Sequence, residues 1–425
     1  MFRDCWWRYM NPAGGEILGS LCGGVGTLVG TVVSEGVGFF WFYREDPGGE
    51  MKKKAKITEE ELNNFLHNTG DVRRRRVARM VEEVQTIMVA LTAQVSSWDS
   101  RFQSISNSGI HSDHLKVMAP SQLLVTVPLR GLSGFRHRRS RRWRYYTPSG
   151  VRLLTPVMEP EKLHQWLEVE QFQKSTPQWH DGDVNIQGDV VPARVVNVFH
   201  GLLLRAIPAC HLSDKVSVME SIGPIIRVNV ETSIQTVDVE LVPVVEVPSG
   251  WPRSARWPRF FKRWPSKDKA RCVKSFGFDL IARTNYHWQL SFLRAERLLL
   301  EGMEEDGGCR MKCLRVVRQL KEDVWCPGTR PVITSQHLQM VLLWECERNP
   351  SSKSWLDFGS CFLRLVRRLL KCSRQRFLRH YFVRRANLLK NADANQLDNL
   401  ADKLARFLQK PSLDMASLHG HSFTC

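Results

Sequence analysis

GIHSDHLKVMAPSQLLVTVPL, residues 109–129, is the stretch that decides the fold of this chain. Its second half predicts a strand over 122–129, in which residues two apart share a face. Gln122 and Leu124 therefore lie on the same face of that strand. The turn that opens the stretch is Gly109-Ile110. Neither Ile110 nor Leu124 carries an atom that binds phosphate or a metal ion.

Further blocks of sequence support one family. They are KVMAPSQLLVTVPL (116–129), VDVELVPVVEVPSGWP (237–252), RWP (256–258), SFGFDL (275–280), NYHWQLSFLRAE (285–296) and LRHYFVRRANLL (378–389). In this order they resemble the Mab-21 family, relatives of cyclic GMP-AMP synthase, over about residues 51–411. The resemblance implies an α+β fold: a nucleotidyltransferase-like mixed sheet with a long spine helix, followed by an all-helical C-terminal lobe.

The resemblance also implies where catalytic groups would stand. An active nucleotidyltransferase holds phosphate at a Gly-Ser turn and two divalent metals between three carboxylates. Here Gly109 and Ile110 occupy the turn, and Gln122 and Leu124 occupy the positions of the paired carboxylates. We therefore predict a pseudoenzyme with no catalytic residues of its own.

The third carboxylate has a candidate in TVDVELVP. Asp238 and Glu240 share one face of a predicted strand whose other face is apolar. By resemblance Asp238 takes the position of the third metal carboxylate, with Glu240 as the alternative register. A half-buried strand with a solvated acidic face gives the same alternation, so both interpretations stay open.

The helical side retains part of a nucleotide pocket. By resemblance Arg318 stands where a basic residue contacts phosphate, and Ser335 stands beside the position of a base-stacking ring, which is Gln336 here. Arginine binds phosphate through two parallel hydrogen bonds. An arginine on an amphipathic helix is also commonly a solvated or ion-paired surface group, and the sequence does not separate these alternatives.

No zinc site is expected. The related synthase carries an inserted His and Cys cluster, whereas residues 304–322 of this chain offer only Cys309 and Cys313. Two thiols fall short of the four ligands of a structural zinc site. We predict no cofactor; magnesium and nucleotide enter only if the chain keeps residual activity or senses a nucleotide.

The basic charge is concentrated locally. The net charge is +18, and residues 361–390 hold ten Lys or Arg and no acid, with Leu363, Val366, Leu370 and Phe377 spaced as one helical stripe. Further clusters lie at 73–76, 135–146 and 256–269, the last with interleaved Trp and Phe. Basic residues and exposed aromatic rings bind polyanions, which makes weak binding of nucleic acid an alternative function. The candidate residues are Arg367, Arg368, Arg374 and Arg376. The other interpretation is that the aromatic rings belong to the core and the charges to solvated faces.

The first fifty residues differ from the rest. Residues 17–43 are largely apolar and rich in glycine, and they contain Glu35. A membrane anchor over 17–43 therefore remains an alternative, although the glycines weaken a helix and Glu35 would lie inside the span. The eleven cysteines show no disulfide framework, so we expect the main body in the cytoplasm or nucleus.

The remaining pattern gives the organisation. Residues 57–68 predict a short capped helix and 71–98 a long one with one apolar face. Strands are expected at 225–231 and 236–247, helices at 160–174 and 193–206, and mainly helices after residue 290. Breaks are expected at 307–308, 326–329, 349–352 and 410. We divide the chain into a Gly-rich extension (1–50), a nucleotidyltransferase-like lobe (51–289), a helical lobe (290–411) and a tail (412–425).

These observations favour a scaffold or regulator that acts through an unidentified protein partner. The family resemblance implies a role in developmental patterning and cell-fate control. Two alternatives remain: a nucleotide sensor or residual nucleotidyltransferase, and a weak, non-specific RNA- or DNA-binding protein.

Overall fold

The computed structural model describes residues 56–106, 114–134, 145–146, 152–153, 172, 174–186, 188–220, 225–252, 255–259, 264–284, 288–328, 331–383 and 386–411. Several sequence predictions lie outside these ranges. They concern the turn at Gly109 and Ile110, most of the helix at 160–174, the extension of residues 1–50 with its candidate span at 17–43, and the tail at 412–425. Within the described ranges, no helix is both long and apolar enough to cross a membrane.

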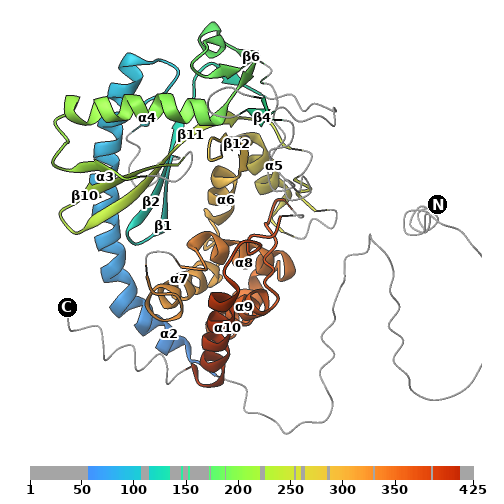
Figure 1. Cartoon of the computed structure of the whole chain (residues 1–425). Coiled ribbons are helices and arrows are strands. Elements are labelled where there is room, and N and C mark those ends of the chain that lie inside the picture. The colour runs from blue at the N-terminus through green and yellow to red at the C-terminus, as the bar shows by residue number, and fades with distance from the viewer. Residues whose placement is uncertain are drawn as a thin grey trace, which may run out of the picture. The chain divides into compact units, whose positions relative to one another are not determined.

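Helices and strands are interspersed up to residue 291, and the described elements after it are all helices (Figure 1). The α-helices are α2 (Glu59–Phe65), α3 (Asp71–Trp98), α4 (Pro192–Ala209), α5 (Lys267–Phe276), α6 (Leu293–Leu300), α7 (Arg310–Leu320), α8 (Ser335–Arg348), α9 (Phe358–Arg374) and α10 (Ala394–Gln409). The π-helices η1 (Leu66–Gly70) and η5 (Lys321–Trp325) continue α2 and α7, and the 3-10 helices are η4 (Pro177–His180) and η6 (Ser352–Trp355). The strands are β1 (Leu115–Ala119), β2 (Gln122–Pro128), β3 (Leu132–Ser133), β4 (Tyr145–Tyr146), β5 (Arg152–Leu153), β6 (Lys174–Ser175), β7 (Asn185–Ile186), β8 (Asp189–Val190), β9 (Val216–Val218), β10 (Ile226–Glu231), β11 (Thr236–Val247), β12 (Phe278–Ile281) and β13 (Gln289–Ser291).

Among the described strands, seven form one mixed sheet. Its main order is β1-β2-β11-β10-β9, and β12 joins β11 and carries β13 on its other edge. β2 and β11 run parallel, whereas the other pairs in this sheet are antiparallel. The mixed sheet, the long α3 and the helical C-terminal region confirm the predicted fold class.

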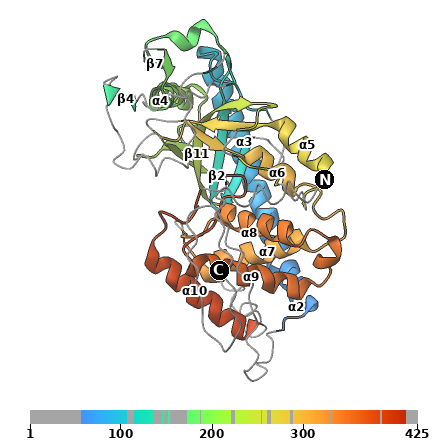
Figure 2. The same cartoon turned by 90° about the vertical axis from the view of Figure 1, so that its right-hand side faces the viewer.

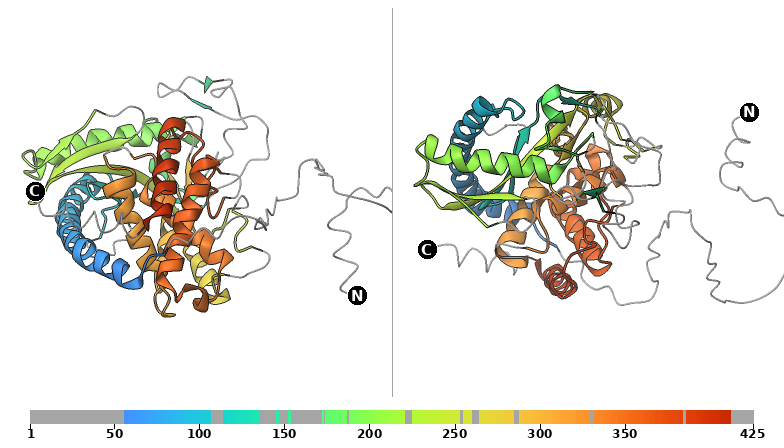
Figure 3. Two further views of the ribbon diagram at one scale, coloured as in Figure 1. Left: turned by 90° about the horizontal axis from the view of Figure 1, so that it is seen from below. Right: turned by 45° about the horizontal axis from the view of Figure 1, so that its top comes forward.

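The spine helix α3 forms where its periodicity predicts it. Met80, Val84, Met88, Leu91 and Val95 follow one another at three- and four-residue steps, and all are buried. They belong to the same apolar cluster as the inward face of β11 and the buried face of α4. Figure 3 shows α4 beside the strands, so α3 and α4 cover one side of the sheet. The opposite side of the sheet is not covered by α3 or α4.

The C-terminal helices begin and end near the predicted breaks. Residues 301–309 separate α6 from α7, residues 326–334 separate η5 from α8, and residues 349–357 separate α8 from α9. Figure 2 shows α6 between the sheet and the helices α7 to α10.

One detail of the predicted stripe on α9 is wrong. Phe377 does not continue the helix and is 40% exposed. α9 ends at Arg374, and Arg376 adopts a φ of 47°. The N–H of Phe377 then donates to the carbonyl of Cys372, and that of Arg376 to the carbonyl of Ser373. This Schellman arrangement terminates the helix and turns Phe377 away from the buried stripe.

An aromatic cluster joins the segment after β11 to the C-terminal region. The rings of Trp251 and Trp257 contact Phe382 with centroid separations of 5.6 and 5.3 Å. Arg259 lies over Trp344 and Tyr381 at 4.1 and 4.5 Å and forms an ion pair with Glu347.

The cluster also bears on the basic segment 256–269. Trp257 is buried and Trp264 is partly buried against the core. Both tryptophans therefore fit the interpretation in which the aromatic rings of this segment belong to the core, and not the one in which they are exposed to bind a polyanion. Phe260 and Phe261 lie outside the described residues.

His337 caps α8 as a neutral ring. The backbone N–H of Thr334 donates to Nδ1 of His337 at 2.9 Å, while the carbonyl of Leu388 contacts the ring. Burial lowers the pKa of His337 to about 4, although the Leu388 contact opposes this shift. The folded protein therefore keeps His337 uncharged at pH values where an unfolded chain protonates it.

This buried histidine predicts a loss of stability in mild acid. From about pH 6.5 down to about pH 4 the unfolded state binds the extra proton, so the free energy of unfolding falls as the pH falls. His337 should contribute a loss of about 2 kcal/mol between pH 7 and pH 5. Urea unfolding of the wild type and of His337→Gln at pH 7 and pH 5 measures the contribution of His337 to this loss. His180→Gln, at an exposed position, should retain the wild-type dependence; equal pH dependence in all three proteins would contradict the assignment.

Candidate functional site

The residues proposed from the sequence for the catalytic face lie together on the sheet. In the parallel pairing of β2 with β11, Gln122 is opposite Asp238 and Leu124 is opposite Glu240. Paired residues of neighbouring strands project from the same face. This is the face away from α3, because Val237, Val239 and Leu241 are buried in the cluster that contains α3.

Leu124 is part of an apolar cluster on this face. The side chain of Leu124 is 4% exposed and packs with Val242, Val244 and Ile281. Met118 and Leu293 close the cluster from β1 and from α6. Hydrocarbon therefore fills the position that the resemblance assigns to a metal carboxylate.

The two acidic residues on the face have different surroundings. The Arg283 side chain holds Glu240 with Nε 2.9 Å from Oε1 and Nη2 2.9 Å from Oε2. Asp238 has a buried Oδ1 without a hydrogen-bond partner among the described residues. Glu240 is thus engaged in an ion pair with Arg283, whereas Asp238 keeps a carboxylate oxygen without a hydrogen-bond partner among the described residues. Within the described ranges, no group of three or more His, Cys, Asp or Glu is placed to hold a metal ion.

Arg318 and Ser335 do not share one open site. Arg318 lies on α7 with its Nε buried and without a hydrogen-bond partner among the described residues, and burial lowers its pKa below the usual value. Ser335 is buried at the first position of α8. Gln336, at the position of the stacking ring, donates to Glu296 at 3.3 Å. Nε of Arg318 thus has no hydrogen-bond partner among the described residues, whereas the hydroxyl of Ser335 is covered.

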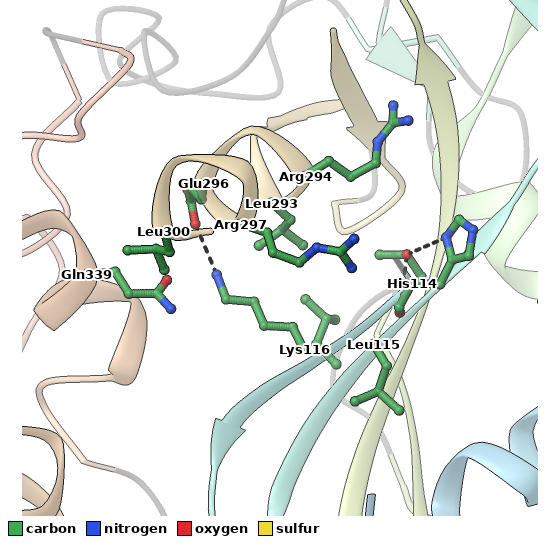
Figure 4. A pocket seen from close by; sticks show the side chains of 11 residues that line it. His114, Leu115, Lys116, Leu293, Arg294, Glu296, Arg297, Leu300 and Gln339 are labelled. Carbon is green, nitrogen blue, oxygen red and sulfur yellow. Dashed lines mark hydrogen bonds and ion pairs between the residues drawn. The ribbon is translucent and has the colours of Figure 1, made fainter. Parts of the chain in front are cut away.

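A pocket opens beside this face, between the β1–β2 edge and the helices α6 and α8 (Figure 4). Its walls include Leu124, Leu293 and Leu300, and its polar groups include Lys116, Arg297 and Gln339. The pocket adjoins the apolar cluster, since Leu124 and Leu293 belong to both.

Glu296 at the pocket connects three parts of the chain. The side chain is 2% exposed, and its Oε2 accepts a hydrogen bond from Nζ of Lys116 at 3.0 Å. Its Oε1 accepts from Gln336 and lies 3.9 Å from Nε2 of His380. Burial lowers the pKa of His380 and Lys116 lowers it further, although the charge of Glu296 opposes both. Lys116 is therefore the main counter-charge for Glu296 at neutral pH.

Comparison with known proteins agrees with this architecture. Residues 111–302 match the Mab-21 protein nucleotidyltransferase domain, and residues 309–406 match the Mab-21 protein HhH/H2TH-like domain. A relative from Xenopus laevis, protein mab-21-like 3, is 71% identical over 357 residues, which cover 84% of this chain and 97% of the relative. The chain belongs to the Mab-21 family. A second mab-21-like 3 protein, from Danio rerio, is 53% identical over 381 residues, covering 84% of this chain and 98% of the relative. The family predicted from the sequence blocks is confirmed.

In this Mab-21 protein the two cysteines considered for zinc are packed inside the helical region. Cys309 caps α7, and its Sγ lies 3.7 Å from that of Cys313. The contact with Cys313 raises the pKa of Cys309 to about 12, so the thiol remains protonated at neutral pH. Both side chains are buried.

The four arginines proposed for polyanion binding divide into two pairs. Arg368 forms an ion pair with the buried Glu345 at 3.1 Å, and Arg376 pairs with Asp398 at 2.7 Å. Arg367 and Arg374 are exposed on α9. Lys371 is exposed between them, so the three cations follow one face of the helix at steps of four and three.

Sequence reasoning missed the pocket and its ion pair. Lys116 and Glu296 both lie in blocks that supported the family, but 180 residues separate them. No periodicity links residues so far apart. The signal that could have found them is chemical: a lysine on an edge strand and a glutamate on the apolar face of a short helix both need a partner when they are buried.

Breaking the Lys116–Glu296 pair should destabilise the protein. Lys116→Met leaves a buried carboxylate without its counter-charge, and the free energy of unfolding should fall by about 3 kcal/mol. The double variant Lys116→Met/Glu296→Gln removes both charges and should recover at least half of that loss. Denaturant unfolding of the wild type, Lys116→Met and the double variant measures these free energies.

An exposed ion pair provides the control for this cycle. Arg271 and Asp268 on α5 have side chains that are 81% and 84% exposed. Arg271→Met should change stability by no more than about 0.5 kcal/mol. If Lys116→Met costs no more than Arg271→Met, the pair does not stabilise the contact between β1 and α6.

Proposed function

We propose that this Mab-21 protein acts by binding, as a scaffold or regulator in developmental or cell-fate control, and does not transfer nucleotides. The observation that carries the proposal is Leu124, which is buried among Val242, Val244 and Ile281 and stands at the position that the resemblance assigns to a metal carboxylate. A two-metal site needs several carboxylates around two hydrated cations. A leucine side chain supplies no ligand, and its apolar neighbours make the position costly for a cation.

The acids nearby support the same proposal. Glu240 is already neutralised by Arg283 through two short contacts, and Asp238 alone provides an unpaired carboxylate oxygen. One carboxylate cannot hold two magnesium ions while they bridge substrate phosphates. The developmental role comes from the family resemblance and requires a protein partner whose identity the chain's chemistry does not specify.

Calorimetric titration of the full chain with ATP and GTP, with and without magnesium, tests the loss of catalysis. We expect no magnesium-dependent binding of either nucleotide and no release of pyrophosphate. The gain-of-site variant Gln122→Glu/Leu124→Asp restores two acids beside Asp238. It should acquire affinity for magnesium that the wild type lacks.

Two results would redirect the proposal. Magnesium-dependent nucleotide binding by the wild type would contradict it directly. Nucleotide binding that does not need magnesium but is lost in Arg318→Gln would favour the second candidate function, a nucleotide sensor. The buried Nε of Arg318, which has no hydrogen-bond partner among the described residues, is the observation that favours the sensor. Arg315→Gln, on the same helix and paired with Glu304, is its matched control.

A third candidate is weak binding of nucleic acid. It is favoured by the exposed row of Arg367, Lys371 and Arg374 on α9. Cations in such a row release counter-ions from a polyanion without reading its sequence. Arg368 and Arg376 support this candidate less, because each already neutralises a carboxylate of the same chain.

The triple variant Arg367→Ala/Lys371→Ala/Arg374→Ala tests this third candidate. If α9 binds RNA, the affinity for a single-stranded oligonucleotide should fall, and the slope of log K against log salt should decrease by about 2. Arg271→Ala/Arg315→Ala/Lys353→Ala removes the same formal charge from other elements and should leave the slope nearly unchanged. Equal effects of both triple variants would mean that the affinity depends on the net charge of the protein and not on the row of cations on α9.

A further inference from the structure

The turn that ends α9 holds an exposed aromatic ring in a fixed place. Phe377 is 40% exposed, and its backbone N–H donates to the carbonyl of Cys372 in the last turn of the helix. Arg376, which precedes it, adopts a φ of 47°. The N–H of Leu378 then donates to Oδ1 of Asn387 at 2.9 Å. Hydrogen bonds on both sides of the ring therefore fix its backbone at the C-terminal end of α9.

Helix termination does not require a phenyl ring at this position. The residue after a left-handed capping residue is commonly apolar because it packs on the last turn of the helix, and a leucine meets that need. Phe377 instead leaves a large part of its ring in water. The guanidinium of Arg379 lies 5.6 Å from the ring centroid, within the range of a cation–π contact. That contact orients the ring without burying it.

A row of cations leads along α9 to this ring. Arg367, Lys371 and Arg374 are exposed, and none of them forms an ion pair with a carboxylate of the described residues. The row spans about 10 Å at the rise of an α-helix. Asp398 of the neighbouring α10 pairs with Arg376 at 2.7 Å. Because that acid is already paired, its charge is spent on Arg376 and not on the row.

The row and the ring together select the chemistry of a ligand. Three cations in line favour a backbone that carries repeated negative charges. An exposed phenyl ring favours a flat partner that can stack on it. Single-stranded nucleic acid offers both, because its bases are free to leave one another and stack on a side chain. The bases of a duplex are paired and stacked inside the helix, so they do not reach Phe377.

The packing of α9 argues against a membrane surface as the ligand. A helix that lies in a membrane interface buries its apolar face in the lipid. The apolar face of α9 is already used inside the protein, where its buried residues include Phe362, Leu365, Val366 and Leu369. Phe377 is then the one apolar group that this surface would bring to a bilayer, whereas stacking a base needs a single ring.

We propose that the surface formed by Arg367, Lys371, Arg374 and Phe377 binds single-stranded nucleic acid, with phosphates on the three cations and one base stacked on Phe377. This proposal rests on the third candidate function, binding of nucleic acid by α9, and adds to it the single strand and the contact with a base. The contact reads no sequence, since a phenyl ring has neither a hydrogen-bond donor nor an acceptor for a base edge.

Three fluorescent probes separate the phosphate contacts from the base contact. They are a deoxyadenylate strand long enough for one site of about 4–16 nucleotides, a strand of the same length with every base removed, and the duplex of the first strand. Binding to the full chain is followed by anisotropy over a range of salt concentrations. The wild type should bind the intact strand at least about fivefold more tightly than the abasic strand, because one stacked base is lost.

Two sets of substitutions assign the contacts. Phe377→Leu keeps an apolar side chain at the turn, so it should lower the affinity for the intact strand about fivefold and leave the abasic strand, the duplex and the salt slope unchanged. The triple variant Arg367→Ala/Lys371→Ala/Arg374→Ala should lower the salt slope by about 2 for both single strands. Phe276→Leu, at the end of α5 and also 40% exposed, is the matched control and should change none of these values.

The outcomes separate this proposal from the function on which it rests. Equal affinity of the wild type for the intact and abasic strands overturns the stacked base without any variant. If the triple variant still lowers the salt slope, binding of nucleic acid by α9 stands alone. No salt-dependent binding of any probe overturns both.

Two further probes test the other classes of ligand. Poly-glutamate of equal charge should displace the intact strand no better than the abasic strand does. Displacement equal to that by unlabelled intact strand would overturn the proposal in favour of an acidic protein segment. Phosphatidylserine vesicles that bind with the same dependence on Phe377 would overturn it in favour of a membrane surface.

Discussion

Glu296, buried on α6, is the residue on which the contacts between β1, α6 and α8 depend. A carboxylate whose side chain is 2% exposed must be compensated, or it forces unfolding or protonation. Its donors come from the sheet edge and from the start of α8. The sheet edge can therefore move away from α6 only if Glu296 loses the charge of Lys116, and α8 can move away only if Glu296 loses the hydrogen bond from Gln336. The rings of Trp251 and Phe382 provide the apolar counterpart of this polar connection.

The same face of the sheet holds the position that the resemblance assigns to a metal carboxylate. Leu124 belongs to the cluster that packs β2 and β11 against Leu293 at the start of α6. Hydrocarbon there contributes to cohesion between the sheet and α6, which carboxylates in the same place would oppose. Under the proposed function a leucine at this position has no cost, since a binding protein needs the shape of the fold and not its chemistry.

The sequence predicted what depends on local periodicity or on recognisable blocks. It gave the bounds of α3, because apolar residues recur over the full length of the helix, and it placed Asp238 and Gln122 on one face. It did not predict that Arg283 would neutralise Glu240, or which arginines of α9 would be exposed. Those outcomes depend on charges brought together from distant parts of the chain. The misplacement of Phe377 has a local cause, a left-handed residue other than glycine.

The parallel pairing of β2 with β11 has a consequence for biogenesis. Gln122 and Asp238 are partners, so β2 leaves the ribosome long before its second neighbour, β11, exists. At about 5–20 residues per second, the delay is roughly 6–23 seconds. During that time Leu123, Val125 and Val127, which are buried in the finished sheet, belong to an apolar β-forming segment without its central neighbour. Such non-local pairing folds slowly and exposes the nascent chain to aggregation. The order of strands in this sheet therefore leaves β2 without one of its two neighbouring strands until β11 has been synthesised.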